Sequence, residues 1–184
     1  LAIAVVVVLV LCIMIFATSL SMMYTKKDGV VCHDSFTSDE GNQITKEIVD
    51  AFMNGQVSLL EEPSEELLEM ENPYDSRARA EKGFYYLWDH CLYNGKYYSY
   101  YGIGPVLALY LPYRLITGYY CPAVWSTLLF SLIGIMCLTK LYLLIIEKWF
   151  KKLPVGTTLM GLVTLQMASG IFFSAARPLF YEIA

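Results

Sequence analysis

An acidic pair near the start of the chain offers the clearest opportunity for chemistry. Asp39 and Glu40 lie in the segment Thr37-Ser-Asp-Glu-Gly41, a short distance beyond a long apolar run. A carboxylate in this setting can act as a general base that accepts the proton of an attacking hydroxyl or amine. An acid at such a position can also cap the N-terminus of a helix. The sequence leaves both interpretations open.

Three apolar segments could position these acids at a membrane surface. The chain is 57% hydrophobic and only 16% charged, a composition that is unusual for a water-soluble domain. We predict transmembrane helices over residues 1–24, 121–146 and 155–178, since roughly 20 apolar residues span the hydrocarbon core. The expected fold class is therefore all-α and integral to the membrane. We expect a fragment of a multi-span helical bundle, with a large extracytoplasmic loop that contains juxtamembrane amphipathic helices.

The charges around these segments predict an orientation. Lys148, Lys151 and Lys152 gather in the short connection 147–154, which the positive-inside rule places in the cytoplasm. The loop 25–101 and the last segment, 179–184, then lie outside the cell. The predicted localisation is the cell membrane, with several passes and an extracytoplasmic long loop.

The long loop is acidic and rich in tyrosine. Fifteen of the 17 acids lie between residues 25 and 100, against seven lysines and arginines, which argues against nucleic acid as a partner. Eleven of the 15 tyrosines lie between Tyr85 and Tyr120. They are typical of an aromatic belt at the headgroups, or of a surface that faces carbohydrate or lipid. Residues 102–118 are apolar, but Pro112 and Arg114 interrupt them, so we predict an interfacial helix there.

Short helices and one turn are predicted within the loop. One helix begins at Ser38 or Asp39 and ends near Asn54, before Gly55. It is amphipathic and could lie on the membrane surface through an apolar face of Ile44, Ile48, Ala51 and Phe52. A second helix follows Pro63-Ser64, and Tyr74 to Lys82 form a third. Asn94-Gly95 predicts a tight turn.

The cysteines and histidines give weaker signals. Cys32 and Cys91 could form a disulfide if the loop faces an oxidising compartment, and free thiols are an equally open alternative. No metal site and no certain cofactor are predicted, because the histidines are isolated in the sequence. His90 suits a structural role. A divalent metal is possible through Asp39, His33, His90 or Glu182.

The order of several motifs resembles a known family, the GT-C glycosyltransferases of family 39, which contains protein mannosyltransferases and aminoarabinose transferases. The resemblance covers roughly residues 1–150, the N-terminal part of such an enzyme, and is closest to uncharacterised bacterial members. It is carried by the acidic pair and by the segments Lys46-Glu-Ile-Val-Asp-Ala-Phe-Met-Asn-Gly55, Glu71-Asn-Pro-Tyr-Asp75, Gly95-Lys-Tyr-Tyr-Ser-Tyr-Tyr-Gly102 and Leu111-Pro-Tyr-Arg-Leu-Ile-Thr-Gly118.

This resemblance implies an activity and roles for individual residues. The donor would be a sugar on a polyprenyl phosphate in a membrane of lipids, and the acceptor a glycan, lipid or protein outside the cell. Asp39 matches the proposed catalytic acid, with Glu40 beside it, and Glu182 matches a second external acid. Arg177 or Arg114 could stabilise the departing phosphate, and Arg114 could instead anchor its helix at the interface. The family's Glu-Lys-Pro-Pro segment is replaced here, so its phosphate-binding lysine is missing.

A second class of function remains open. The chain could be a non-catalytic membrane protein, such as a transporter fragment or a cell-envelope assembly or binding protein. Transporters usually carry polar or broken helices at the membrane midplane. Here the polar residues gather in the long loop, which favours chemistry at the membrane surface over transport through it.

Overall fold

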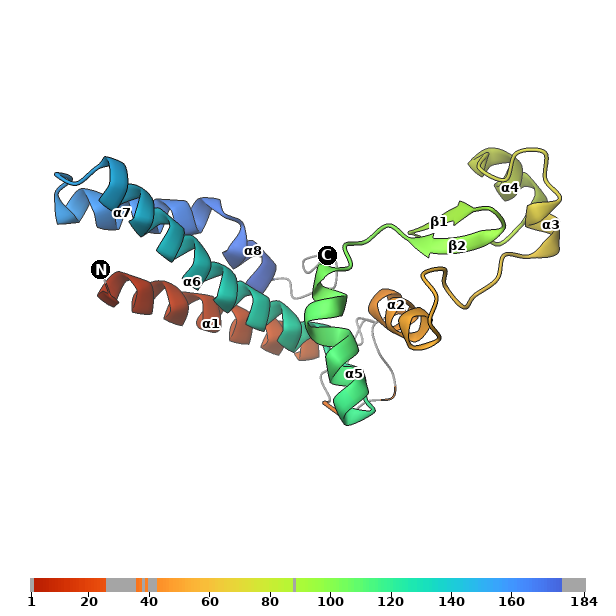
Figure 1. Cartoon of the computed structure of the whole chain (residues 1–184), viewed down its shortest axis with the longest axis horizontal. Coiled ribbons are helices and arrows are strands. Elements are labelled where there is room, and N and C mark those ends of the chain that lie inside the picture. Colours follow the sequence, from red (N-terminus) through yellow and green to blue (C-terminus); the bar gives the residue numbers. More distant parts are fainter. Residues whose placement is uncertain (1, 26–35, 38, 40–42, 88, 177–184) are drawn as a thin grey trace. The chain divides into compact units, whose positions relative to one another are not determined.

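The chain forms two compact units. A computed structural model describes residues 2–25, 36–37, 39, 43–87 and 89–176 (Figure 1). Unit 1 comprises Leu1–Glu40 and Cys121–Ile183, and unit 2 comprises Gly41–Tyr120. Each unit has more contacts within itself than with the other.

Unit 1 is made of helices. They are α1 (Ala2–Thr25), α6 (Ala123–Trp149), α7 (Val155–Ala168) and α8 (Ile171–Ala176). Helix α1 packs against α6 and α8, and these helices lie side by side in Figure 1. Their shared core consists of buried apolar side chains from all three helices: Val8, Cys12, Phe16, Val124, Ile135, Phe172 and Ala175.

One of these helices is suited to crossing a membrane. Helix α6 has 27 residues, and it is the one helix among the described residues that is long and apolar enough to span a bilayer. The other apolar stretches, Val5–Thr18, Val106–Thr117 and Val155–Ala168, are shorter. This helix supports an association of the chain with a membrane.

The predicted fold class is wrong in two respects. The described residues contain a single helix of membrane-spanning length and composition, so they do not form a multi-span bundle. They also contain a two-stranded sheet, so the fold is not all-α. The prediction failed because apolar composition over about 20 residues measures how strongly a segment avoids water, and not whether it forms one continuous helix.

The segment predicted as a third span illustrates this failure. Helix α7 ends at Ala168, and Gly170 adopts a left-handed backbone with φ of 79° before α8 begins at Ile171. A glycine reaches this conformation without the steric cost that a Cβ atom brings, and it commonly terminates helices. The run 155–178 therefore holds two short helices where one was predicted.

Polar contacts join α6 to α7. The buried Gln166 amide donates hydrogen bonds to Thr139 Oγ1 at 2.8 Å and to the Ile135 carbonyl at 3.2 Å. Tyr142 donates to the Thr158 carbonyl at 2.9 Å, and its hydroxyl lies where a Cβ at Gly161 would stand. A buried polar group is costly unless it is hydrogen-bonded, so these contacts fix how the two helices pack.

Unit 2 combines short helices with a hairpin. Its elements are α2 (Gln43–Met53), α3 (Glu65–Leu68), α4 (Ser76–Lys82), β1 (His90–Tyr93), β2 (Lys96–Ser99), η1 (Val106–Tyr110) and α5 (Leu111–Thr117). Strands β1 and β2 pair antiparallel, with His90 opposite Ser99 and Tyr93 opposite Lys96. The turn predicted at Asn94-Gly95 is confirmed, since both residues have positive φ, as a two-residue hairpin turn requires.

Helix α2 buries the apolar face that the sequence assigned to a membrane surface. Ile44, Ile48 and Ala51 are buried, and the helix packs against η1 and α5. That prediction is therefore wrong for this face, which meets protein rather than lipid. The described part of the helix begins at Gln43, and its end before Gly55 is confirmed. The start predicted at Ser38 or Asp39 depends on residues 38 and 40–42, which lie outside the described residues.

The next two helices begin at side-chain caps. Ser64 Oγ accepts a hydrogen bond from the Leu67 amide, and this bond confirms the helix predicted after Pro63-Ser64. The Asp75 carboxylate accepts from the amides of Arg77 and Ala78, so α4 begins two residues later than Tyr74, the predicted start. Each cap satisfies amides that have no partner within the helix.

A wide helical turn precedes α5. The Leu111 amide bonds to the Val106 carbonyl, five residues back, so η1 is a π-helical turn. Pro112 follows, and it has no amide hydrogen to donate. The π turn thus lies directly before the residue that would break an ordinary helical ladder, within the segment predicted as an interfacial helix.

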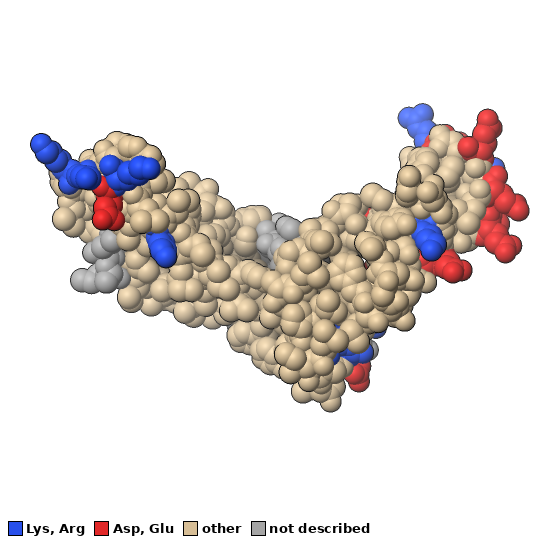
Figure 2. Space-filling model, in the orientation of Figure 1, with Lys and Arg blue, Asp and Glu red and all other residues tan. Residues whose placement is uncertain are grey.

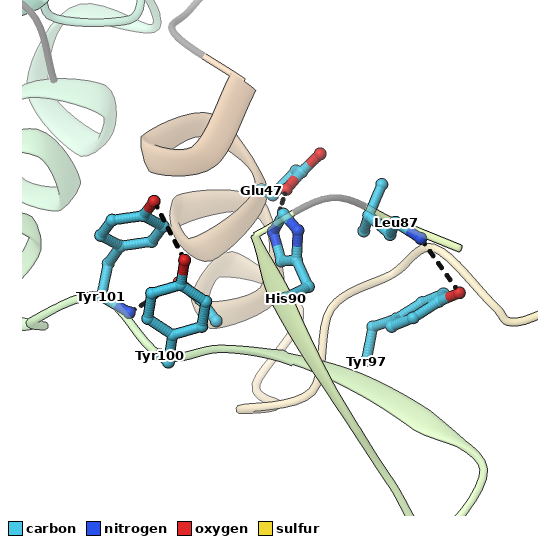
Figure 3. A network of polar contacts seen from close by, with 7 residues as sticks. Glu47, Leu87, His90, Tyr97, Tyr100 and Tyr101 are labelled. Atoms are coloured by element: carbon cyan, nitrogen blue, oxygen red, sulfur yellow. Dashed lines mark hydrogen bonds and ion pairs between the residues drawn. The ribbon is translucent and has the colours of Figure 1, made fainter. Parts of the chain in front are cut away.

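We predict that Tyr97 is the tyrosine of the hairpin on which folding depends most. Tyr97 is 1% exposed, and its hydroxyl accepts a hydrogen bond from the buried Leu87 amide at 3.3 Å (Figure 3). Tyr97→Phe leaves that amide without its partner, so the free energy of unfolding should fall by about 1–3 kcal/mol. Chemical denaturation of the full chain in detergent measures this change.

Tyr93→Phe is the matched control for this prediction. The Tyr93 residue is 63% exposed. Loss of its hydroxyl therefore leaves water, and no buried amide, without a hydrogen-bond partner. Its unfolding free energy should stay within about 0.5 kcal/mol of the wild type. Equal stabilities for the two variants would show that the Tyr97 hydroxyl does not support the fold.

Candidate functional site

Asp39 lies in a short segment that is anchored to α6. The ring of Phe36 stacks on Trp125, with centroids 5.7 Å apart and planes at 29°. Trp125 is in the first turn of α6, and its ring also contacts Phe16 of α1 at 5.7 Å. The exposed Asp39 therefore stands three residues from an aromatic contact at the N-terminal end of the helix that is long and apolar enough to span a bilayer.

Both interpretations of Asp39 stay predictions. Helix α2 begins at Gln43, and residues 40–42, whose amides a cap at Asp39 would contact, lie outside the described residues. Aromatic side chains at the end of a membrane helix favour the headgroup boundary. An exposed carboxylate at that boundary can accept a proton from a group that arrives from water.

Three of the predicted site residues cannot be placed. Glu40, Arg177 and Glu182 lie outside the residues that the structure describes. Their roles beside Asp39, on the donor phosphate and as a second external acid stay predictions. His33, one of the histidines considered for a metal, lies outside the described residues as well.

Arg114 is in the last turn of α5 in unit 2. Its guanidinium donates to the carbonyl of Gly118, the residue that ends the helix with φ of 79°. Its Cζ atom also lies 4.2 Å from the centre of the Tyr120 ring. A cation at a helix C-terminus stabilises the unpaired carbonyls there, so Arg114 anchors the end of α5.

Tyr120 gathers polar groups from two helices. Its hydroxyl donates to Asp50 Oδ1 on α2 at 2.5 Å, and Lys46 Nζ lies 5.2 Å from its ring centre. Two cations, Lys46 and Arg114, therefore lie against one buried aromatic ring. Sequence reasoning missed Lys46, although its spacing of four residues from Asp50 predicts that both side chains share one face of α2.

A buried histidine joins α2 to the hairpin. His90 Nε2 lies 2.8 Å from Glu47 Oε2, and the histidine side chain is almost fully buried (Figure 3). At this distance, an Nε2–H group of the imidazole can donate a hydrogen bond to the carboxylate. This contact supports the structural role predicted for His90. Within the described ranges, no three His, Cys, Asp or Glu side chains converge as metal ligands would.

Aromatic rings pair on the hairpin and on the segment that directly follows it. Tyr93 and Tyr98 meet edge to face at 6.4 Å, and the rings of Tyr100 and Tyr101 stack at 4.6 Å (Figure 3). Tyr100 is 57% exposed, and its hydroxyl donates to Asp89 Oδ1 at 3.1 Å. Exposed rings beside a carboxylate can pack on sugar C–H groups while the carboxylate accepts hydrogen bonds from sugar hydroxyls.

Cys121 is a poor nucleophile. Burial raises the pKa of the Cys121 thiol to about 11, so at neutral pH this side chain stays protonated. Cys91 is exposed and free, and Cys32, its possible disulfide partner, lies outside the described residues. Covalent catalysis by Cys121 is therefore disfavoured.

Comparison of the chain with protein-family models, with curated proteins and with solved structures found no match. The resemblance to family 39 glycosyltransferases is neither supported nor opposed by these comparisons. Function therefore has to be argued from the residues and contacts described above.

Proposed function

We propose that this chain transfers a sugar from a polyprenyl-phosphate donor to an acceptor outside the cell, with Asp39 as the general base. One observation supports the proposal most directly. The stack of Phe36 on Trp125 holds the segment that carries Asp39 at the N-terminal end of the helix suited to cross the membrane. A lipid-linked donor presents its sugar at that same level, next to the headgroups.

The proposed reaction is an inverting displacement at the anomeric carbon. Asp39 takes the proton of the acceptor hydroxyl or amine as the acceptor attacks the sugar carbon. A bond to the acceptor forms, the bond from that carbon to the phosphate oxygen breaks, and polyprenyl phosphate leaves with the electron pair. Glu40 would assist beside Asp39, and Glu182 would act as the second external acid.

The departing phosphate needs a positive partner. A guanidinium suits this role because it offers paired donors to phosphate oxygens. Arg177 is the residue we assign to it. Arg114 already bonds to the end of α5 and packs on Tyr120, so we regard its contribution to the donor site as secondary.

The proposal also needs the N-terminal end of α6 to lie outside the cell. Lys148, Lys151 and Lys152 gather at the opposite end of this helix, and Figure 2 shows the basic cluster at that end of unit 1. The positive-inside rule then places this end in the cytoplasm. Unit 2, whose acids cluster over α3 and α4, would face outward.

We predict that a cysteine in unit 2 is accessible from outside an intact cell. Glu62→Cys, at an exposed loop position that spares the Ser64 cap, should react with a membrane-impermeant thiol reagent. Lys151→Cys should react only after the cells are opened. Both variants need Cys32 and Cys91 replaced by serine, since Cys91 is itself exposed. Labelling of Lys151→Cys but not Glu62→Cys in intact cells would refute the orientation and the proposed site with it.

We further predict that Asp39→Asn abolishes most of the transferase activity. Asparagine keeps the size of the side chain but cannot take the acceptor proton, and loss of a positioned general base costs about 10²–10⁴-fold in rate. The measurement is sugar transfer from a polyprenyl-phosphate donor by the full-length protein in detergent. Glu62→Gln, which removes another exposed acid, is the control and should keep wild-type activity.

The outcomes of this assay separate the two functions. Equal rates for wild type and Asp39→Asn would remove Asp39 from the mechanism. A folded wild-type protein that transfers no lipid-linked sugar would contradict the enzymatic proposal as a whole. The binding function below would then become the leading one.

A second function, as a membrane-anchored carbohydrate-binding protein, is favoured by the aromatic face of the hairpin. Tyr100 combines a largely exposed ring with a hydrogen bond to the Asp89 carboxylate, and Asp89 has an unusual positive φ of 59°. Non-glycine residues rarely adopt this conformation, and such strain often accompanies binding sites. This function requires no catalysis by Asp39.

We predict that Tyr100→Ala weakens glycan binding by this protein. Loss of one stacking ring should lower the affinity about 2- to 10-fold, on the scale of aromatic pair energies. Binding of the full chain to an array of hexose and hexosamine oligosaccharides measures the effect. Tyr85→Ala removes an equally exposed tyrosine outside the hairpin and should bind as the wild type does. Similar losses for both variants, or no binding at all, would contradict this role.

A further inference from the structure

The C-terminal end of α5 combines exposed apolar side chains with two cations. Leu115 and Ile116 are 63% and 84% exposed, and Arg114 precedes them directly. Lys46 from α2 lies against the same Tyr120 ring as Arg114. The hairpin surface uses none of these residues, and the proposed transfer reaction uses only Arg114, in a secondary role.

We propose that this end of α5 is a membrane-docking surface of unit 2. Leu115 and Ile116 insert into the interfacial layer of the bilayer, and Lys46 and Arg114 bind the headgroup phosphates of anionic phospholipids. The partner that this surface binds is therefore the lipid bilayer. The inference does not depend on the proposed glycosyl transfer, because it concerns how unit 2 is held and not what it catalyses.

Chain connectivity places these residues close to a bilayer. Tyr120 precedes the first residue of α6, Ala123, by three positions. Three peptide units reach at most about 11 Å, so Tyr120 stays near the level at which a membrane-crossing α6 leaves the hydrocarbon. The headgroup region lies at this level, and phosphates are its strongest hydrogen-bond acceptors.

The apolar pair is suited to insertion and not to the core of unit 2. The α2 helix buries its apolar face against η1 and α5, whereas Leu115 and Ile116 of α5 stay exposed. Apolar side chains on interfacial helices penetrate about 5–10 Å into the boundary between headgroups and acyl chains. Two adjacent exposed residues at a helix end can reach this depth without unfolding the helix.

Around the Tyr120 ring, the two cations outnumber the one carboxylate that the structure describes there, that of Asp50. Asp50 accepts the hydrogen bond of the Tyr120 hydroxyl, and Glu47 contacts His90. Helix α5 itself contains no acid. Figure 2 shows most of the acids on its visible face of unit 2 over α3 and α4.

Guanidinium and ammonium groups complement each other at such a surface. Arg114 offers several donors beyond the one that bonds to Gly118, and Lys46 adds a mobile point charge. The tyrosine ring between α2 and α5 keeps both cations at one place. Tyrosine itself favours the membrane interface.

The test follows a probe on α5 in vesicles. The full chain carries Ile116→Cys labelled with an environment-sensitive fluorophore, in a background where Cys32, Cys91 and Cys137 are serine. It is reconstituted in phosphatidylcholine, with or without phosphatidylglycerol. We expect a blue-shifted emission, and quenching by lipids that bear a spin label just below the headgroup, when phosphatidylglycerol is present. High salt should reduce both signals.

Lys46→Gln is the decisive variant, because Lys46 makes a ring contact and its loss spares the bonds of α5. One cation near an anionic surface is worth about a fivefold change in the ratio of docked to undocked protein, so quenching should fall accordingly. Lys96→Gln removes a cation from the hairpin and should leave quenching unchanged. Arg114→Lys should retain most of the signal, since the charge is kept.

Three results would overturn the proposal. The first is a probe that stays in water in vesicles containing phosphatidylglycerol. The second is equal quenching for Lys46→Gln and Lys96→Gln. The third is a blue shift that appears in detergent and grows with protein concentration, which would mean that a second copy of the chain covers Leu115 and Ile116 instead of lipid.

Discussion

Burial of one face of α2 holds unit 2 together. Ile44, Ile48 and Ala51 form an apolar face that meets η1 and α5, and this burial supplies the non-directional part of the stability. Two polar contacts at the edges of the same helix then fix its direction. Glu47 reaches His90 in the hairpin, and Asp50 accepts the Tyr120 hydroxyl. If α2 were displaced, the hairpin would lose its contact with Glu47, and α5 would lose its packing against α2.

Unit 1 is governed by a different constraint. A helix that crosses a membrane must satisfy its polar side chains within the protein, because the hydrocarbon offers no hydrogen-bond partners. Helix α6 meets this requirement with the Gln166 and Thr139 contact and with the bond from Tyr142 to Thr158. These contacts come from α7, so the two helices form a paired structure although α7 is too short to span a bilayer itself.

The candidate functional residues share a relation to the N-terminal end of α6. Asp39 is tied to it by the stacking of Phe36 on Trp125, and Tyr120 is tied to it by the covalent chain. In the proposed orientation, both ties would bring polar and aromatic groups to the level of the headgroups. A lipid-linked substrate and an anionic lipid surface present their phosphates at this level, so the proposed reaction and the proposed attachment would share one helix end.

The sequence by itself determined the elements whose signals are local. The apolar run of α6, the turn at Asn94-Gly95, the cap at Ser64 and the stop at Gly55 each depend on a few neighbouring residues, and each is present in the structure. The amphipathic character of α2 was also evident. Periodicity defines a face of a helix, however, and does not state what covers that face.

Only the tertiary structure decided what covers α2 and which groups meet across the chain. Its apolar face is buried by protein, because η1 and α5 supply apolar partners that the sequence pattern could not assign. Asp50 and Tyr120 are 70 residues apart, and no local signal predicts a bond between them. The left-handed Gly170 interrupts an apolar run whose composition alone predicted one helix. Hydrophobicity specifies that a segment leaves water, whereas packing partners and backbone dihedrals specify where it goes.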